Sequence, residues 1–199
     1  MNSVPESLVA LLRHGETEGG ARFCGSTDVP LTPLGWRQMR AAAGGEPWRR
    51  IVASPLRRCA DFARELAVEL NLPLELDERL REMHFGAWEG HSAAELMAAD
   101  AEALARFWRD PAANPPPGAE PLDEFQARVL AAWGALRQTP CQGQVLVISH
   151  GGVMRTILSD VLGHPLENLL ELEIEIVHGS LHRVRLRGAA SELLDGKPR

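Results

Sequence analysis

The sequence predicts an α/β fold, a three-layer α/β/α sandwich with a mostly parallel central sheet and an antiparallel C-terminal strand. Residues 9–12 and 145–149 are continuous apolar runs, which are typical of strands buried on both faces of a sheet. Segments with helical spacing of apolar residues lie between these runs. Residues 170–186 instead alternate apolar and charged side chains, the pattern of antiparallel strands. A chain of 199 residues fits one domain, which we expect over residues 1–199.

In the first half, the strand at 9–12 is expected to lead directly into Arg13. Thr32 and Pro33 indicate a helix start, with the helix continuing to about Ala43. A strand at 51–53 follows, and Ser54 with Pro55 predicts the next helix start. The buried face of that helix is predicted to carry Leu56, Cys59, Phe62, Leu66 and Leu70.

In the second half, Ser92 and Glu95 form a capping-box pattern that begins a helix. Its predicted buried face carries Met97, Ala101, Leu104 and Trp108. A further helix is indicated by Leu122, Phe125, Val129, Trp133 and Leu136. The strand at 145–149 ends at His150. The helix after it is expected to bury Val153, Ile157, Leu158 and Val161 and to stop at Gly163 and Pro165.

The alternating C-terminal segment predicts a hairpin whose loop is His178-Gly179-Ser180. This register pairs Glu175 with Arg183, Glu173 with Arg185 and Glu171 with Arg187. Each exposed pair contributes only about 0.2–1 kcal/mol, but together they would fix the register.

The composition excludes several classes of protein. The formal charge of −6 argues against a nucleic-acid-binding protein, and the apolar runs are too short for a transmembrane helix. The N-terminus lacks the pattern of a signal peptide. Cys24, Cys59 and Cys141 are an odd number without CxxC spacing, which argues against disulfides or a zinc site and favours a reducing compartment. We therefore expect a cytoplasmic protein without nucleic-acid or membrane partners. A homodimer is an open alternative.

Two predicted strands end in histidine followed by glycine, at His14-Gly15 and His150-Gly151. Ligands of open α/β sheets bind beyond the carboxyl ends of the strands, so the two histidines can face one pocket. The glycine after each lets the backbone turn sharply and leaves room for a ligand oxygen. A single pair of this kind would more often be a hydrogen-bonded strand end, whereas two such pairs favour a functional site.

Charged residues near these histidines point to an anionic ligand. Arg13 adjoins a buried strand and needs either a carboxylate such as Glu16 or a bound anion as its partner. Arg57 and Arg58 lie in a predicted first helical turn, where free N–H groups also favour anions. Of the acids at Glu78, Glu82 and Glu89, Glu82 is the candidate proton donor, because Phe85 and Trp88 can wall off its carboxyl group.

Five motifs occur in order over roughly residues 8–187. They are Arg13-His14-Gly15-Glu16-Thr17, Gly25-x-x-Asp28-x-Pro30-Leu31-Thr32-x-x-Gly35, Ser54-x-Leu56-x-Arg58, Glu82-x-x-Phe85-Gly86-x-Trp88-Glu89-Gly90 and Ser149-His150-Gly151-Gly152. This ordered set resembles the histidine phosphatase superfamily, which has the phosphoglycerate mutase-like fold.

The resemblance implies that His14 is the nucleophile and becomes phosphohistidine. It implies that Arg13, Arg58 and His150 surround the phosphoryl group, with Arg58 selected over Arg57 by the motif spacing. Glu82 would protonate the leaving group and then activate water. Gly151, Cys24 and Gly25 would complete the phosphate site, with no metal or other cofactor.

One position departs from the family pattern, and several alternatives stay open. The family commonly has Asn where this chain has Gly20, so an amide donor to phosphate is missing. Further short motifs of this chain are most similar to those of α-ribazole phosphatases. This resemblance predicts that the substrate is α-ribazole 5′-phosphate of cobalamin biosynthesis. Phe23 and residues 115–118 are expected at the pocket mouth.

The alternatives are a phosphatase of another sugar or nucleotide phosphate, a phosphoglycerate mutase, a catalytically silent phosphate-binding module and a metal-dependent hydrolase. Cys24 in place of the mutase Thr and the short segment 109–121 favour hydrolysis over mutase activity. The silent module is disfavoured because the nucleophile and the proton donor are present. The metal-dependent hydrolase is disfavoured because its ligand spacing is absent.

Overall fold

The computed structural model describes residues 6–139, 143–188 and 190–195, and in this part of the chain one six-stranded sheet forms. Its order is β3-β2-β4-β1-β5-β6. The strands are β1 (Glu6–Arg13), β2 (Trp48–Ala53), β3 (Leu74–Leu76), β4 (Gln144–Ser149), β5 (Leu181–Arg187) and β6 (Ala190–Leu193). The first four in the sheet order pair in parallel, whereas β5 and β6 are antiparallel to their neighbours. The predicted mixed sheet is therefore confirmed.

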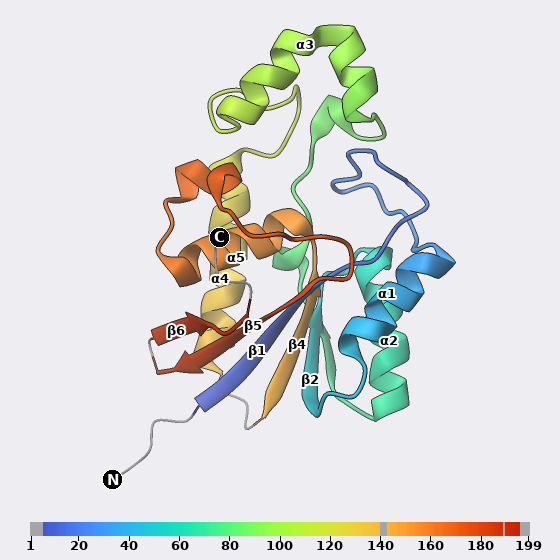
Figure 1. Cartoon of the computed structure of the whole chain (residues 1–199), viewed down its shortest axis with the longest axis vertical. Helices are drawn as coiled ribbons and strands as arrows, with labels where there is room; N and C mark the ends of the chain where they lie inside the picture. Colours follow the sequence, from blue (N-terminus) through green and yellow to red (C-terminus); the bar gives the residue numbers. More distant parts are fainter. Residues whose placement is uncertain (1–5, 140–142, 189, 196–199) are drawn as a thin grey trace.

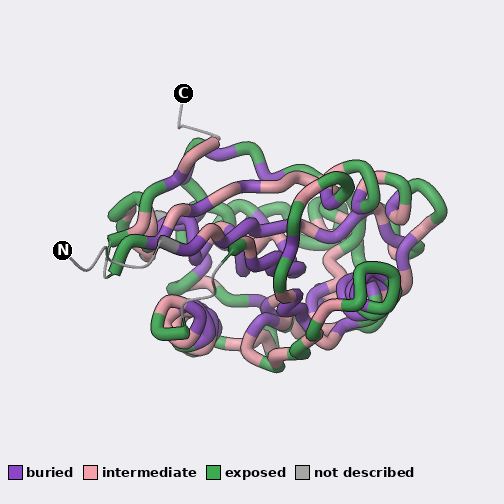
Figure 2. The backbone as a smooth tube through the Cα atoms, turned by 90° about the horizontal axis from the view of Figure 1, so that it is seen from below, coloured by how far each residue is buried: buried purple, intermediate pink, exposed green. Residues whose placement is uncertain are grey.

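Helices cover both faces of this sheet (Figure 1). The α-helices are α1 (Pro33–Ala43), α2 (Arg57–Leu70), α3 (Ala93–Arg109), α4 (Leu122–Gln138) and α5 (Gly151–Leu162). The 3-10 turns are η1 (Glu78–Leu80), η2 (Gly86–Trp88) and η3 (Leu166–Glu171). Successive strand residues point to opposite faces, so Leu12 packs into the core under α1 and α2 and Leu11 into the core under α4 and α5. Figure 2 shows the buried residues running through the middle of these three layers.

Two helix starts follow their predicted caps, and one begins later. The Thr32 hydroxyl accepts from the Gly35 amide at 3.0 Å, and the Ser92–Glu95 capping box is complete. The helix α2 begins at Arg57 instead of at Pro55. The reason lies in Ser54, whose buried hydroxyl bonds to the His150 ring at 2.7 Å and serves the site rather than a helix cap.

The predicted buried faces of α2 and α3 need correction. Leu70 is 41% exposed at the last turn of α2, whereas the other four positions of that stripe are buried. On α3, Met97 is 60% and Trp108 49% exposed. A non-helical residue, Asp100, kinks α3, so a stripe drawn through the kink does not stay on one face. The α3 helix stands beyond the sheet, where it buries Leu104 and Phe107 in a small separate core with Trp88.

The predicted C-terminal hairpin is wrong, although its alternating apolar residues are buried except for Leu170, which is 37% exposed. Both edges of β5 are already paired, with β1 on one side and β6 on the other. The segment 172–177 instead has no regular secondary structure. It buries Leu172, Ile174 and Ile176 and exposes the residues between them. Arg183 forms ion pairs with Glu46 and Asp195, and Arg185 with Glu192, in place of the predicted partners.

Two general expectations can also be compared with the structure. Among the described helices, none combines the length and apolar character needed to cross a membrane. Cys24 and Cys59 are both free thiols, and Cys141 lies outside the described residues.

Candidate active site

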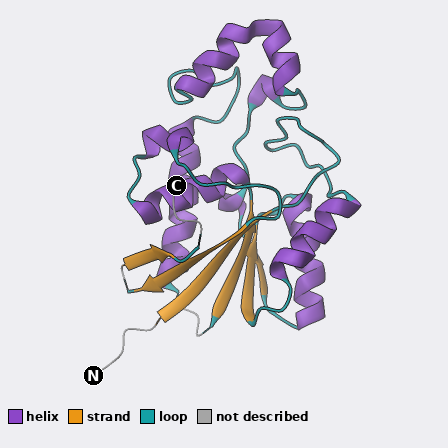
Figure 3. Ribbon diagram, viewed as in Figure 1, coloured by secondary structure: helices purple, strands orange, loops and turns teal. Residues whose placement is uncertain are grey.

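The two strand-end histidines lie side by side, as the sequence predicts. The central strands β1 and β4 are parallel neighbours, with Arg13 in register with Ser149, so the next residues His14 and His150 reach the same sheet edge. The His14 amide donates to the Ser149 carbonyl at 2.9 Å, and the two ring centroids are 5.2 Å apart. The strands converge there beneath the long connecting loops (Figure 3).

His14 is held in a form suited to nucleophilic attack. Its ring Nδ1 lies 2.8 Å from the Gly15 carbonyl oxygen, which can only accept, so Nδ1 carries the proton. Burial lowers the pKa of His14 well below its ordinary value, and the positive charges of Arg58 and Arg13 lower it further. The neutral ring therefore presents a free lone pair on Nε2.

Gly15 allows this turn because only glycine fits there. A Cβ at Gly15 would lie 2.2 Å from the Gly35 carbonyl oxygen. The motif glycine is thus needed for close packing against the backbone of Gly35, whereas the predicted role was room for a ligand oxygen.

Arg13 offers charge and an unused donor to the site. Its Nη1 donates to the Ile176 carbonyl at 2.6 Å, while its buried Nε has no hydrogen-bond partner among the described residues. The guanidinium lies over Gly151, whose ideal Cβ position is 3.5 Å from Nε. Burial lowers the pKa of Arg13, but an arginine stays charged in proteins. A bound anion would satisfy both the charge and the donor.

Arg58 is almost completely buried, and its hydrogen-bond partners carry no formal negative charge. Nη2 and Nη1 donate to the backbone carbonyls of Gly25 and Thr27 at 2.5 and 2.8 Å, and Nε donates to His150 Nδ1 at 3.1 Å. Arg58 as a whole residue is 1% exposed, so little water screens the charge of its guanidinium. This geometry keeps a full positive charge beside His14.

The structure places His150 behind the cavity wall instead of in it. The residue has no exposed surface, its Nδ1 accepts from Arg58, and its Nε2 therefore donates to Ser54. Burial, with the charge of Arg58, lowers the pKa of His150 well below its ordinary value. His150 thus orients Arg58 and packs edge-on against His14. His150 is not among the described lining residues of the cavity, so the direct phosphate contact that the resemblance implies stays a prediction.

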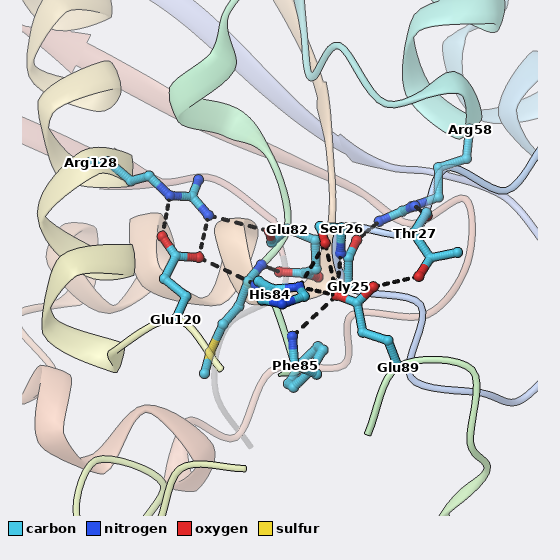
Figure 4. A network of polar contacts seen from close by, with 11 residues as sticks. Gly25, Ser26, Thr27, Arg58, Glu82, His84, Phe85, Glu89, Glu120 and Arg128 are labelled. Carbon is cyan, nitrogen blue, oxygen red and sulfur yellow. Dashed lines mark hydrogen bonds and ion pairs between the residues drawn. The ribbon is translucent and has the colours of Figure 1, made fainter. Parts of the chain in front are cut away.

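The carboxylate of Glu82 is fixed at the N-terminus of α5. It accepts from the Gly152 amide at 3.0 Å and from the Met83 amide at 3.1 Å. A Cβ at Gly152 would approach Glu82 Oε1 to 2.4 Å, so the second glycine of the motif makes room for the acid. Behind it, Arg128 of α4 binds the Glu82 carbonyl and the Glu120 carboxylate (Figure 4). It also binds the carbonyls of Arg79 and Arg81.

These residues surround a cavity of about 270 Å³. The predicted residues Arg13, His14, Cys24, Gly25, Arg58, Glu82 and Gly151 all line it. Among the described lining residues Glu82 is the single acid, so the cavity is strongly positive although the whole chain is negative. Such a cavity selects an anion.

Four lining residues lie outside the predicted site residues and motifs, namely Arg22, Arg155, Ile176 and His178. Arg155 lies four positions after Gly151 on α5, a spacing that places both on one helix face and could have revealed it. His178 stacks on His14 with ring centroids 5.4 Å apart, but it lies in an irregular loop with no sequence pattern. Burial lowers the pKa of His178.

Gly20 lines the cavity where the resembling family commonly has Asn. It has a φ of +63°, and no atom lies within 4 Å of an ideal Cβ there. The amide donor is therefore absent and its space is open.

A second, apolar cavity of about 160 Å³ adjoins the first and shares Phe23, Glu82 and Arg155 with it. Its walls include Phe85, Phe107 and Trp108. The Phe23 ring lies 5.1 Å from Phe85 and 6.2 Å from Trp108, centroid to centroid. A phosphate ester in the first cavity would direct its organic part toward these rings.

Phe23 thus lies beside the site as expected, whereas the proline loop does not. Pro115, Pro116 and Pro117 line a separate cleft of about 440 Å³ beside α3. The Pro117 carbonyl accepts from the Ala87 amide at 2.9 Å, so this loop packs on η2 and away from His14. Only Pro111 of the proline-rich segment reaches the apolar cavity among its described lining residues.

Comparison with known proteins decides the family. A family model for the histidine phosphatase superfamily (branch 1) matches residues 9–195. This chain belongs to the histidine phosphatase superfamily. A solved mycobacterial glucosyl-3-phosphoglycerate phosphatase, in a complex with VO3, superposes with a TM-score of 0.83 at 30% identity, covering 96% of this chain and 98% of that one.

Curated relatives within the superfamily carry different substrate names. A Hydrogenobacter thermophilus protein, named provisionally as phosphoserine phosphatase 2, is 30% identical and covers 92% of both chains. A glucosyl-3-phosphoglycerate phosphatase of Mycolicibacterium vanbaalenii is 35% identical over 80% of this chain and 76% of its own. The Escherichia coli adenosylcobalamin/alpha-ribazole phosphatase is 28% identical over 83% and 84%. This histidine phosphatase therefore has relatives that share its fold and differ in their organic substrate.

Proposed function

We propose that this protein is a phosphomonoesterase that works through a phosphohistidine at His14. The observation that carries the proposal is the hydrogen bond from His14 Nδ1 to the Gly15 carbonyl, because it leaves Nε2 unprotonated beside two arginines. An imidazole in this state can attack a phosphoryl group directly.

The reaction has two steps. In the first, Nε2 forms a bond to phosphorus, the bond from phosphorus to the ester oxygen breaks, and Glu82 gives its proton to the departing oxygen. In the second, water attacks phosphorus, the carboxylate of Glu82 takes the water proton, and the P–N bond breaks to release phosphate and neutral His14. Arg13 and Arg58 stabilise the negative charge on the phosphoryl oxygens in both steps.

For the substrate we propose α-ribazole 5′-phosphate. The support is the apolar cavity beside the phosphate site, since aromatic walls bind the flat base of α-ribazole better than they bind a bare sugar. The Escherichia coli relative adds support from its name. The reaction would then be a step in the biosynthesis of cobalamin.

A second candidate substrate is glucosyl-3-phosphoglycerate. The relatives with this name are more similar in sequence, at 33–35% identity. Arg155, which lines both cavities, offers a cation for the carboxylate of such a substrate. The two candidates differ in the group that distinguishes their organic part, an aromatic base on ribose in one and a carboxylate in the other.

The test is phosphate release in the presence of a chelator from α-ribazole 5′-phosphate, glucosyl-3-phosphoglycerate and 3-phosphoglycerate, for the wild type and His14→Ala. We expect release that requires His14 and is fastest with α-ribazole 5′-phosphate. His14-dependent release that is fastest with another ester would overturn the substrate and keep the mechanism. A folded protein that isomerises 3-phosphoglycerate, or that binds phosphate without hydrolysing any ester, would overturn the hydrolase. Loss of activity in chelator would indicate a metal-dependent hydrolase instead.

A further inference from the structure

Glu89 collects hydrogen bonds from the loop that borders the phosphate cavity (Figure 4). Its Oε1 accepts from the Ser26 amide at 2.7 Å and from the Ser26 hydroxyl at 3.0 Å, and Oε2 accepts from the Thr27 hydroxyl. The same carboxylate accepts from the Phe85 amide at 3.2 Å and contacts the His84 ring at 2.7 Å. One side chain thus joins residues 25–27 to the segment that follows Glu82.

The packing around this carboxylate is tight. A Cβ at Gly25 would lie 2.3 Å from Glu89 Oε1, and Gly25 has a φ of +45° that favours glycine. Burial alone would raise the pKa of Glu89, but the hydrogen bonds from Thr27, Ser26 and His84 outweigh it and lower the pKa. Glu89 is therefore an anion with a saturated set of donors.

The other side of the same loop holds Arg58. The Gly25 and Thr27 carbonyls accept hydrogen bonds from the two Nη groups of Arg58, so together with His150, which accepts from Nε, they fix where its guanidinium lies. Glu89 accepts from the Ser26 amide and from the hydroxyls of Ser26 and Thr27. Arg58 donates to the Gly25 and Thr27 carbonyls of the same loop. Arg13 is held differently, by the Ile176 carbonyl.

We propose that Glu89 is a positioning residue, which sets the guanidinium of Arg58 for phosphoryl binding through the loop 25–27. This inference rests on the proposed phosphatase function. Glu89 does not line the described cavity, so its effect on the reaction passes through Arg58. A role confined to stability would instead lower the melting temperature without a specific link to Arg58.

The test is a double-mutant cycle with the dissociation constant of inorganic phosphate and kcat as readouts. Glu89→Gln keeps an acceptor but loses the charge, and Thr27→Val removes one donor to Glu89 while keeping the carbonyl that binds Arg58. We expect Glu89→Gln to weaken phosphate binding and lower kcat by about tenfold in the wild type, and by less than about twofold when Arg58→Ala is already present. Glu89→Ala is expected to have a larger effect than Glu89→Gln, and Thr27→Val a smaller one.

Two controls separate positioning from stability. Combined with Arg13→Ala, Glu89→Gln is expected to keep its full effect, because Arg13 is held by another loop. Asp195→Ala removes a carboxylate that also binds a backbone amide and an arginine, but at the far edge of the sheet, so it should leave phosphate binding unchanged. Equal effects of Glu89→Gln in the Arg58→Ala and wild-type backgrounds would overturn the proposal. Hydrolysis that does not need His14 would instead overturn the phosphatase function on which it rests.

Discussion

His14 acquires its reactive form from its nearest neighbours. The Gly15 carbonyl fixes the tautomer, and burial beside two arginines keeps the ring neutral. Glu82 is similarly fixed by the amide and the missing side chain of Gly152. At this scale the motif glycines matter because they let charged and titratable groups approach the backbone closely.

A prediction at this scale concerns Gly152→Ala. The new Cβ would overlap Glu82 Oε1 at 2.4 Å, so the carboxyl group has to move away from its position. We expect kcat to fall at least about tenfold, since a misplaced acid–base group loses most of its contribution. Phosphate binding should change little. The matched control is Gly134→Ala on α4, where a Cβ meets no atom within 4 Å and activity should be unchanged.

If Gly152→Ala leaves kcat within twofold of the wild type, the position of Glu82 is not what limits proton transfer. Steady-state kinetics of both variants, with phosphate as a product inhibitor, give the answer directly.

At the scale of elements, helices that do not line the phosphate cavity still support its walls. Arg128 of α4 binds the carbonyls of Arg79, Arg81 and Glu82 and pairs with Glu120. Its guanidinium lies 4.8 Å from the Phe125 ring centroid, which fixes it further. The α3 helix, in turn, supplies Phe107 and Trp108 to the apolar cavity.

We predict that Arg128→Met lowers both stability and kcat. Its side chain is 24% exposed, and the carbonyls it leaves are partly buried, so the free energy of unfolding should fall by about 2–4 kcal/mol. Arg106→Met on α3 should cost less than about 1 kcal/mol, because its pair with Glu102 is an exposed one within the helix. Urea denaturation of the two variants measures this difference. Equal losses of unfolding free energy in the two variants would show that the buried contacts of Arg128 contribute no more than an exposed ion pair.

A second prediction concerns Trp108→Ala on α3. Trp108 is 49% exposed, so the fold should tolerate its loss, while one wall of the apolar cavity disappears. We expect kcat/KM for α-ribazole 5′-phosphate to fall about tenfold, and kcat/KM for 3-phosphoglycerate to stay within twofold. Met97→Ala, exposed on the same helix and absent from the described cavity walls, is the control. An equal loss with both substrates would argue against an aromatic subsite.

At the scale of the whole molecule, the fold was predictable where the signal is local. The buried runs before His14 and His150 predicted the two strands and their shared pocket, because the carboxyl ends of parallel strands lie at one edge of the sheet. The order of the strands in the sheet was not predicted. The hairpin prediction failed because β5 pairs with β1 and β6. The segment 172–177, which is nearer in sequence, forms no strand and packs three apolar side chains against the core. The contact of His178 with His14 depends on the same long-range arrangement, so no local sequence pattern predicts it.

The buried histidines also give the whole molecule a pH dependence. Burial lowers the pKa of His14 and His150 in the folded state, while in the unfolded chain histidine titrates near about 6.5. Below that pH the unfolded state binds more protons than the folded state, so stability is full above it and is lost as the pH falls. We expect the free energy of unfolding to drop between about pH 7 and 5, and more gently in His150→Asn. Identical slopes for the two proteins would contradict the lowered pKa.

In the proposed mechanism, His14 accepts the phosphoryl group from the substrate. The measurement that tests it most directly is rapid acid-free quenching of the enzyme with a ³²P-labelled substrate, followed by mapping of the labelled peptide. The phosphohistidine mechanism predicts an acid-labile, base-stable label on His14 that forms before phosphate appears and is absent from His14→Ala. Turnover without any label on His14, or with the label retained in His14→Ala, would contradict it.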